Sequence, residues 1–421
     1  MAESRQPQRV VLDRFRCTIG IAVSRNCRHI RAALMRCEGR GLDARCRVEC
    51  FVQQPVARQA KVLFRKLSGQ ARHAAPLASI LSAQLAEVEA ELVEQLLARG
   101  GQFAERVLAI GVHDPGLWRH EQGLTGYVSL SDAARLAELT GLNVIDAFAA
   151  RDVALDGAGR PLLAIPKWLL LRHFHHARVL LELGPMLRAT WLPAFHDSGD
   201  VCRIWSIGLG VGTRLVDCLF KSLCKPGTEH AAAQRADNGR LIEALYDKWL
   251  SEVFDAGTVP RRDNQQALAE RLAKMAVDVG GLETTSTADL LCTATHLVAE
   301  IAARRMMQQL PASFATDEIV IAGYSGQTAF LAQQLAARLP KHRLLRELEG
   351  QITDESLGPA AVAVLALLTL DQVPGNSTAI TGARLPRVLG RLTPGSPHAW
   401  HQLLRDAADH KSPIVSLRSA M

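Results

Sequence analysis

The order of apolar segments along this chain repeats once. Each half begins with three short apolar or alternating runs separated by turn residues, and helical segments alternating with buried strands follow. The three runs indicate antiparallel strands of one sheet, which the later strands extend. The repeat therefore predicts two like-folded α/β domains with a cleft between them. The expected strands of these triplets are residues 18–23, 30–37 and 44–52, and then residues 178–183, 187–192 and 202–207.

Helices and buried strands complete each half. Ligand-binding loops are expected at the carboxyl ends of the parallel strands, facing the cleft. The first half has expected helices at 76–97 and 130–140 and strands at 107–112 and 144–146, and the second half has helices at 239–254, 265–277, 286–309 and 328–339 and a strand at 318–322.

The segment 204–217 carries a specific loop signal. An apolar strand runs into Gly208, Gly210 and Gly212 and then into an amphipathic helix. Missing Cβ atoms let backbone N–H groups converge on a phosphate, and a helix N-terminus adds its dipole. The other interpretation is a tight turn that packs the helix against the strand. The loop carries no acid, base or nucleophile before Asp217, so it looks like a cleft loop without its reactive side chain.

Length and composition limit the class of protein. A chain of 421 residues that is 48% hydrophobic and 22% charged is typical of a globular protein of several domains. The polar first eight residues predict no signal peptide, and the most apolar tract, 360–370, is too short to span a bilayer. Nine cysteines without Cys-x-x-Cys spacing predict reduced thiols in a cytoplasmic protein.

Positive charge is concentrated near the N-terminus. The net charge is +7, and residues 1–72 contain 16 Lys or Arg against 5 Asp or Glu. Such a region binds nucleic acid or an anionic surface in some proteins. Here the arginines alternate along strands, with isolated phenylalanines instead of an aromatic platform. A solvated basic face is the favoured interpretation, and anion or nucleic-acid binding is the alternative.

Two histidine signals are ambiguous. Residues 173–176, His-Phe-His-His, look like a metal-binding tract, but without cysteine or acid nearby a solvated helix end explains them better. His113 ends a buried strand, so it is either a cleft residue or a hydrogen-bonded turn histidine. No metal site is predicted.

Two further stretches carry a family pattern. Residues 374–390 contain Pro-Gly-Asn, then Thr-Gly-Ala and then Val-Leu-Gly. Residues 152–161 read Asp-Val-Ala-Leu-Asp-Gly-Ala-Gly-Arg-Pro. The first stretch resembles the anhydro-N-acetylmuramic acid kinase family, and the second resembles that family's Asp-x-Ala-x-Gly-Gly-Gln-Gly-Ala-Pro motif. Weaker similarities continue in the family's order from Thr18 to Pro394.

The resemblance implies a fold, cofactors and a reaction. The fold is α/β, with two actin-like domains around a cleft: residues 1–147 with about 375–421, and residues 148–374. The implied cofactors are ATP and Mg²⁺. The implied reaction phosphorylates the O6 of anhydro-N-acetylmuramic acid while water opens its anhydro ring, a step of peptidoglycan recycling in the cytoplasm. The implied partners are therefore a small anhydro-sugar and a nucleotide; no membrane is expected, and a homodimer is a possible assembly.

The family's first phosphate turn is altered here. The resemblance aligns Ser-Gly-Thr-Ser-x-Asp-Gly with Val-Ser-Arg-Asn-Cys-Arg-His at 23–29. Ser24 replaces the glycine, Arg25 and Asn26 replace the hydroxyl pair, and Arg28 replaces the acid. Guanidinium groups contact anions, but they cannot bind Mg²⁺, which requires oxygen ligands.

The family's catalytic base is also missing. Its Asp-Thr-Gly-Pro-Gly-Asn aligns with Gly-Leu-Gly-Val-Gly-Thr, which places Gly208 at the base and leaves no predicted catalytic residue. The family's Asn-x-Gly-Gly-Ile-x-Asn becomes Glu-Leu-Gly-Pro-Met-Leu-Arg at 182–188. A second nucleotide turn, Gly-Gly-Gly-Ala in the family, becomes Gly-Tyr-Ser-Gly, so Gly323 and Ser325 are expected there.

These departures leave three hypotheses. The leading one is a family member with lost or strongly reduced kinase activity. The second is an active kinase that uses substitute groups, and the third is a basic anion-binding or nucleic-acid-binding protein. The expected substrate-cleft positions are His113, Asp152, Asp156, Gly208, Gly210, Gly212 and Asp217, of which Asp152, Asp217 and His113 are the substitute groups.

Overall fold

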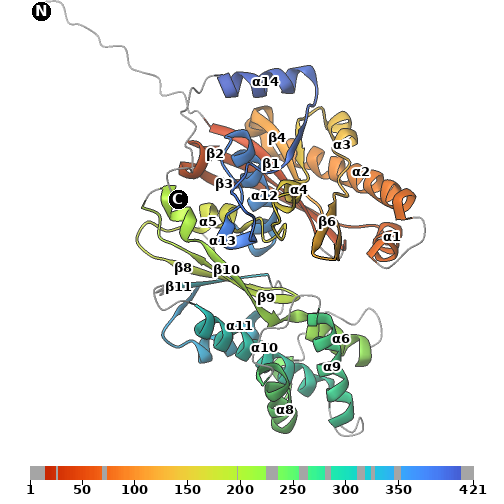
Figure 1. Ribbon diagram of the computed structural model, residues 1–421, viewed down its shortest axis with the longest axis vertical. Helices are drawn as coiled ribbons and strands as arrows, with labels where there is room; N and C mark the ends of the chain where they lie inside the picture. Colours follow the sequence, from red (N-terminus) through yellow and green to blue (C-terminus); the bar gives the residue numbers. More distant parts are fainter. Residues whose placement is uncertain are drawn as a thin grey trace, which may run out of the picture. The chain divides into compact units, whose positions relative to one another are not determined.

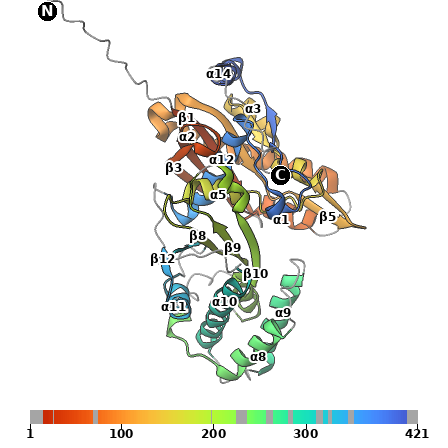
Figure 2. The same cartoon turned by 60° about the vertical axis from the view of Figure 1, so that its left-hand side comes forward.

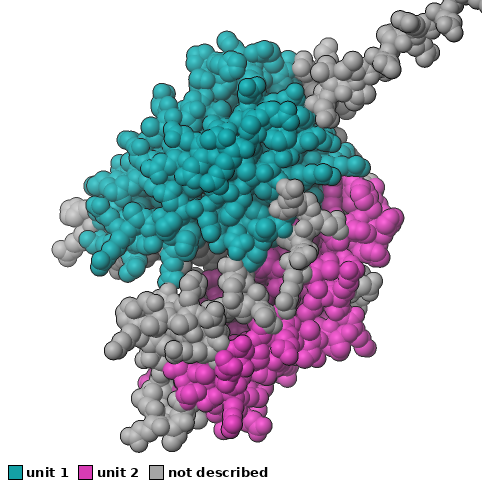
Figure 3. Space-filling model, turned by 180° about the vertical axis from the view of Figure 1, so that it is seen from behind, with its two compact units in different colours: residues 1–170, 349–421 teal, residues 171–348 magenta. Residues whose placement is uncertain are grey.

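The computed structural model divides the chain into two compact units, coloured separately in Figure 3. Unit 1 comprises residues 1–170 and 349–421, and unit 2 comprises residues 171–348. The residues that the structure describes are 15–24, 27–68, 74–196, 198–223, 236–255, 264–279, 286–310, 318–323, 328–345 and 352–408.

The expected boundaries at 147 and 374 both lie inside unit 1. Helix α4 (Phe148–Val153) buries Phe148 in the same core cluster as Val362 and Leu365 of α12 (Asp354–Leu370). Because these segments share one core, the chain enters unit 2 only at Leu171, the last residue of α5 (Ala164–Leu171). It re-enters unit 1 at residue 349, before α12. The structure therefore assigns both segments to unit 1.

Unit 1 is built on a six-stranded sheet (Figures 1 and 2). Its strand order is β13-β7-β4-β1-β2-β3; β1, β2 and β3 are antiparallel, and β4 and β7 run parallel to β1. The bounds are β1 Phe15–Val23, β2 His29–Glu38, β3 Arg45–Pro55, β4 Val107–His113, β7 Val144–Asp146 and β13 Arg391–Thr393.

Helices cover both faces of this sheet. On one face, Ile19 and Ile21 of β1 pack with Leu81 and Leu85 of α2 (Ala74–Gly100). On the other face lies α12, which is buried on nearly all sides. The apolar tract 360–370 is therefore a central core helix, and no helix among the described residues is long and apolar enough to cross a membrane. Smaller elements of unit 1 are α1 Arg58–Ser68, β5 Leu117–Glu121, β6 Leu124–Val128, α3 Ala133–Thr140, α13 Thr378–Thr381 and α14 Pro397–Ala408.

A buried charge network fixes the end of α12 to the sheet. Arg16 of β1 donates to both carboxylate oxygens of Asp371, at 2.5 and 2.8 Å. The same carboxylate accepts the Gly41 N–H at 2.7 Å, and Arg40 connects it to Asp406 of α14. The Asp371 side chain is only 3% exposed, so the network joins four chain segments within the protein interior.

Unit 2 repeats this topology. Its order is β10-β9-β8-β11-β12, again with three antiparallel strands followed by two parallel ones. The helices contribute to a single core on one face of the sheet, together with Leu181 and Leu183. The predicted pair of like-folded α/β domains is thus confirmed at the level of topology. The bounds are β8 Arg178–Leu183, β9 Met186–Leu192, β10 Trp205–Val211, α6 Thr213–Leu223, α8 Glu243–Phe254, α9 Asn264–Val279, α10 Thr287–Gln309, β11 Glu318–Ala322, α11 Thr328–Arg338 and β12 Arg343–Leu345.

Glu89 of α2 gives unit 1 a specific pH dependence. Its side chain is fully buried, and neither carboxyl oxygen has a hydrogen-bond partner among the described residues. Burial raises the pKa of Glu89, and the negative charges of Asp114, Asp132 and Asp146 raise it further. The native carboxyl therefore keeps its proton at pH values where the unfolded one has lost it. The unfolding free energy should fall as pH rises above about 4.3, by up to about 1.4 kcal/mol per pH unit, until the native group ionises.

Glu89→Gln removes this dependence, because the amide does not titrate. Denaturant unfolding at a series of pH values should give a flatter profile for Glu89→Gln than for the wild type. Glu94→Gln, an exposed position on the same helix, is the matched control and should keep the wild-type slope. Parallel profiles for the wild type and Glu89→Gln would contradict the assignment.

Candidate functional site

The carboxyl ends of β1 and β4 lie side by side in unit 1. The two strands are parallel, with Ala22 in register with His113, and Ser24 follows directly after β1. Two of the predicted positions, Ser24 and His113, are therefore brought to the same edge of the sheet. Arg25 and Asn26 lie outside the described residues.

The turn between β1 and β2 is closed by its own hydrogen bonds. The Ser24 Oγ accepts the backbone N–H groups of Arg28 and His29, both at 2.9 Å. The Cys27 N–H donates to the Ser24 carbonyl at 2.7 Å, and Cys27 adopts a positive φ of 51°. Three amide donors of the turn are thus bonded within it, so they are not directed at a ligand.

Positive side chains surround this turn. Arg28 and His29 are exposed, and Arg31 of β2 and Lys61 of α1 are half-buried. Partial burial lowers the pKa of His29, and the charges of Arg31, Lys61 and Arg28 lower it further. The charges that act on His29 are therefore all positive, whereas Cys27 of the same turn also feels the negative charge of Glu89.

His113 is a neutral imidazole beside a structural acid. Burial lowers the pKa of His113, and the charge of Asp114 opposes this effect. The Asp114 carboxylate, which sequence analysis did not single out, accepts the N–H groups of Gly116 and Leu130 and the Tyr127 hydroxyl. It thereby fixes the β5–β6 hairpin against the start of α3. Its position directly after a buried strand was the only signal in the sequence.

Asp152 joins two segments that are far apart in the chain. Its side chain is fully buried, and its carboxylate accepts the Gly159 N–H at 2.8 Å, the Asn376 side-chain amide at 2.5 Å and the Thr381 hydroxyl at 2.6 Å. A Cβ atom at Gly157 would lie 2.2 Å from the same carboxylate. Asp152 is a buried structural acceptor, which corrects the expectation of a carboxylate on a cleft loop.

Asp156 has the opposite environment. It adopts a positive φ of 64°, and its carboxylate pairs with Arg384 at 2.9 Å while both side chains remain mostly exposed. Exposed pairs of this kind contribute little to stability. Asp156 therefore lies near Asp152 in sequence but does not share its hydrogen bonds.

In unit 2, the predicted glycine loop is largely strand. Strand β10 continues through Gly208 and Gly210, with a bulge between them. The N–H groups of Gly212 and Thr213 donate to the carbonyls of Pro185 and Gly184. The interpretation as a phosphate-binding loop is therefore wrong for these two amides, because protein carbonyls already accept them. The alternative, a turn that packs helix and strand closely, fits the structure.

The three glycines differ in the space that is available for a side chain. At Gly210, φ is +135° and a Cβ atom would lie 2.6 Å from the Arg305 guanidinium, which donates to the Leu209 and Val253 carbonyls at 2.8 and 2.6 Å. At Gly212, a Cβ atom would lie 2.3 Å from the Gly184 carbonyl oxygen. At Gly208, the nearest atom would be the Met186 Cε at 3.7 Å. Only Gly208 has room for a side chain.

Gly208 belongs to a cross-strand row. Glu182 of β8 is in register with Arg188 of β9, which is in register with Gly208. Register partners point to the same face of a sheet, and this row alternates with the core residues of unit 2. Burial lowers the pKa of the Arg188 guanidinium, and the charge of Glu182 opposes this effect. Arg188 also donates to Ser206, at 3.4 Å.

The remaining predicted positions of unit 2 are Gly323, Asp217 and Ser325. Gly323 follows β11 with a φ of +98°, and a Cβ atom there would lie 3.2 Å from the Leu183 nitrogen at the end of β8. Asp217 is an exposed residue on α6. Ser325 lies outside the described residues.

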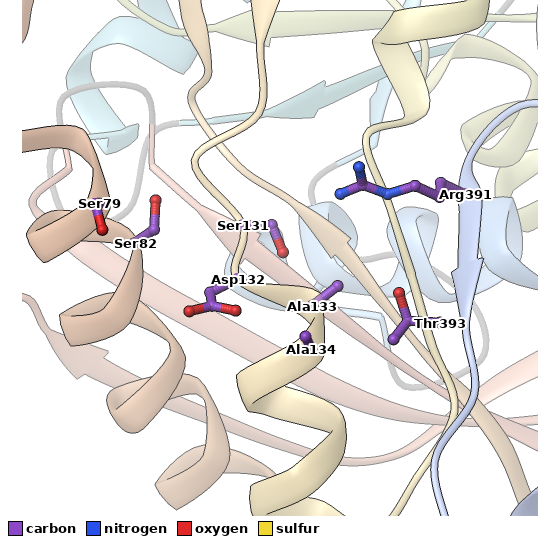
Figure 4. Close-up of a pocket in the computed structure, with 8 residues that line it drawn as sticks. All are labelled: Ser79, Ser82, Ser131, Asp132, Ala133, Ala134, Arg391 and Thr393. Carbon is purple, nitrogen blue, oxygen red and sulfur yellow. The ribbon is translucent and has the colours of Figure 1, made fainter. Parts of the chain in front are cut away.

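A surface pocket of about 440 Å³ lies elsewhere on unit 1 (Figure 4). Its two charged residues already have partners: Asp132 caps α3, and Arg391 pairs with the buried Asp146 at 2.7 Å. None of the predicted site residues lines this pocket. The lining residues are Ser79, Ser82, Ser131, Asp132, Ala133, Ala134, Arg391 and Thr393.

Comparison with known proteins decides the family. The family model described as anhydro-N-acetylmuramic acid kinase matches residues 29–395. The chain belongs to the anhydro-N-acetylmuramic acid kinase family. The kinase of this name from Cupriavidus metallidurans is 28% identical over 321 residues, or 75% of this chain and 82% of the relative. The one from Shewanella loihica is 28% identical over 323 residues, or 75% and 83%.

Solved structures are more distant. The activator of the 2-hydroxyisocaproyl-CoA dehydratase from Clostridium difficile, with bound ADPNP, matches with a TM-score of 0.40 and 9% identity, over 83% of this chain and 94% of the other. Family membership and the repeated sheet topology identify the fold class as α/β with two actin-like units. The expected cleft between the units stays a prediction.

The described part of the first turn does not fit the Mg²⁺ that the family implies. The charged side chains that act on His29 are Arg28, Arg31 and Lys61, which offer no carboxylate oxygen, and the acid whose charge acts on Cys27, Glu89, is fully buried. Mg²⁺ requires oxygen ligands in near-octahedral geometry. In addition, the described ranges contain no group of three or more His, Cys, Asp or Glu side chains arranged to hold a metal ion.

Alanine substitution should affect stability differently at the three glycines of β10 and the following turn. We expect Gly210→Ala and Gly212→Ala each to lower the unfolding free energy by roughly 1–3 kcal/mol, because of the positive φ and the backbone clash respectively. Gly208→Ala is the internal control and should be neutral or stabilising by about 0.5 kcal/mol. Denaturant unfolding checks this, and equal losses at all three positions would contradict it.

Asp152 should behave as a structural residue. Asp152→Asn weakens charged hydrogen bonds and places an amide donor among donors, so the unfolding free energy should fall by roughly 1.5–3 kcal/mol. Asp156→Asn removes only the exposed pair with Arg384 and should change it by less than about 1 kcal/mol. Thermal and denaturant unfolding of both variants measure the difference. A fully stable Asp152→Asn protein would refute this role.

Proposed function

We propose that this family member binds the ligands of an anhydro-sugar kinase but turns them over slowly or not at all. The observation that supports this proposal is the Glu182–Arg188–Gly208 row. Where the resemblance expects Asn, Asn and a catalytic Asp, the chain has an acid, a guanidinium and no side chain. The position of the base has no proton acceptor, and a cation occupies the adjacent register position.

The physical consequence is a loss of rate. A positioned general base contributes about 10²- to 10⁴-fold to such reactions. The substitute groups give little support for recovery, because Asp152 is fully buried with its carboxylate bonded and Asp217 is an exposed helix residue. A cytoplasmic location, a small anhydro-sugar ligand and a homodimer are parts of this proposal that follow from the family.

A second candidate function is an active, divergent kinase. One observation favours it: burial lowers the pKa of His113, so the imidazole is neutral at pH 7 and able to accept a proton. In that case His113→Ala abolishes turnover while leaving nucleotide binding intact. Under the leading proposal, His113→Ala leaves any residual turnover unchanged.

Coupled turnover of anhydro-N-acetylmuramic acid with ATP and Mg²⁺ tests the leading proposal. We expect the wild type to be at least about 10²-fold slower than the Cupriavidus metallidurans relative. Turnover within tenfold of that relative ends the proposal.

A sharper test replaces the residues of the Glu182–Arg188–Gly208 row by the residues that the resemblance expects. Gly208 has room for the Cβ atom of an introduced Asp, but Arg188 is in register with this position, and we expect it to pair with the new carboxylate and to reduce its basicity. The triple variant Glu182→Asn, Arg188→Asn and Gly208→Asp should therefore raise turnover at least tenfold, and Gly208→Asp alone should raise it less. Gly208→Asn within the same triple background is the control without a carboxylate and should give no gain.

A further inference from the structure

Two cysteines lie opposite each other on neighbouring strands of unit 1. Cys37 of β2 is in register with Cys46 of β3, so the two side chains lie on the same face of the sheet. Directly opposed residues of an antiparallel pair have Cα atoms about 4.5–5.5 Å apart, and a disulfide needs about 4.4–6.8 Å. The two thiols, both reduced in this structure, also share a hydrogen bond. Strand register therefore places them within reach of a disulfide bond.

The other two cysteines of these three antiparallel strands are not paired in this way. Cys17 of β1 is in register with Arg36, and Cys50 of β3 is in register with Leu34. The Cys50 thiol instead donates to the Leu96 carbonyl of α2, at 3.7 Å. Register thus selects a single cysteine pair in β1, β2 and β3.

The two opposed thiols differ in their access to solvent. Cys37 is 0% exposed, whereas Cys46 is half-buried and lies on β3, the last strand in the order of the sheet (Figure 1). Burial raises the pKa of the Cys37 thiol, and its hydrogen bond to Cys46 raises this pKa further. The thiolate is the attacking species in disulfide exchange, so a dissolved reagent reacts first at Cys46. The exposed Arg45 and Arg47 on either side attract a negatively charged reagent.

We propose that Cys37 and Cys46 form a redox modification site, at which a small anionic disulfide such as oxidised glutathione converts the two thiols into an intrachain disulfide. The inference is independent of the proposed function, because neither cysteine belongs to the candidate site.

The reaction has two exchange steps. The Cys46 thiolate attacks one sulfur of oxidised glutathione, a mixed disulfide forms on Cys46, and one glutathione leaves as a thiolate that takes up the proton released from Cys46. The Cys37 sulfur then attacks the Cys46 sulfur, and its proton goes to the second glutathione as that molecule leaves. The protein gives up two electrons and two protons, and one oxidised glutathione becomes two reduced molecules.

Peptide mass spectrometry of the full chain tests the proposal. The native protein is incubated with oxidised glutathione, the remaining thiols are alkylated, and trypsin cleaves after arginine. The expected disulfide then joins peptides 37–40 and 46–47, neither of which contains another cysteine. Cys17 and Cys50 belong to other tryptic peptides, so a different pairing has a different mass. We expect the linked peptides 37–40 and 46–47 as the main protein disulfide.

Serine substitutions distinguish the roles of the two thiols. Cys37→Ser removes the second attacking group, so glutathione should accumulate on peptide 46–47 at least about tenfold above the wild-type level. Cys37→Ala places no hydroxyl in the core and should give the same result. In Cys46→Ser, the buried Cys37 should stay unmodified. Cys50→Ser is the matched control, because Cys50 is also half-buried on β3, and it should form the linked peptides as the wild type does.

Three results would overturn the proposal. The first is the absence of the linked peptides from the oxidised wild type. The second is another cysteine pair linked to the same extent, which would indicate unselective oxidation. The third is modification of Cys37 in Cys46→Ser at the rate at which the wild type forms its disulfide, since Cys46 would then have no role in the reaction.

Discussion

The close approach of α12 to β1 and β4 is the contact on which unit 1 depends. A Cβ atom at Gly20 would lie 2.0 Å from the Pro359 carbonyl oxygen, and one at Gly111 would lie 2.8 Å from the Ala366 Cβ. Only glycine permits this distance, so the helix axis lies directly against the strands. The segment that follows α12 stays in unit 1, where Asn376 and Thr381 reach the buried carboxylate of Asp152.

The positions that match the family and those that depart from it differ physically. Gly20, Gly157, Gly210 and Gly212 each face an atom that excludes a side chain, and Asp152 holds the two best-matching motifs together. These residues maintain the backbone. The departures at positions 28 and 208 concern side chains that the fold does not require, since a Cβ atom at Gly208 would make only an ordinary van der Waals contact and Arg28 is exposed. The fold of this family is therefore compatible with the change of chemistry that we propose.

Two of the departures place a positive charge at, or beside, a position where the resemblance expects an acid. Arg28 replaces an acid in one unit, and in the other Arg188 stands in register with the position of a lost acid. Metal binding and proton abstraction both need oxygen atoms with negative charge, whereas guanidinium groups attract anions. Under the proposed function, both changes act against metal-assisted phosphoryl transfer.

The sequence alone determined the repeated α/β topology, because the apolar runs of 178–183 and 187–192 report burial directly, and motifs near 152 and 374 determined the family. Tertiary structure decided the rest. Hydrogen bonds between residues more than 200 positions apart showed that Asp152 is structural, and strand register brought Glu182, Arg188 and Gly208 into one row. It also showed that β10 continues through its glycines, since the pairing of this strand with β9 extends to Val211. Contacts of this range depend on packing, which local sequence patterns do not encode.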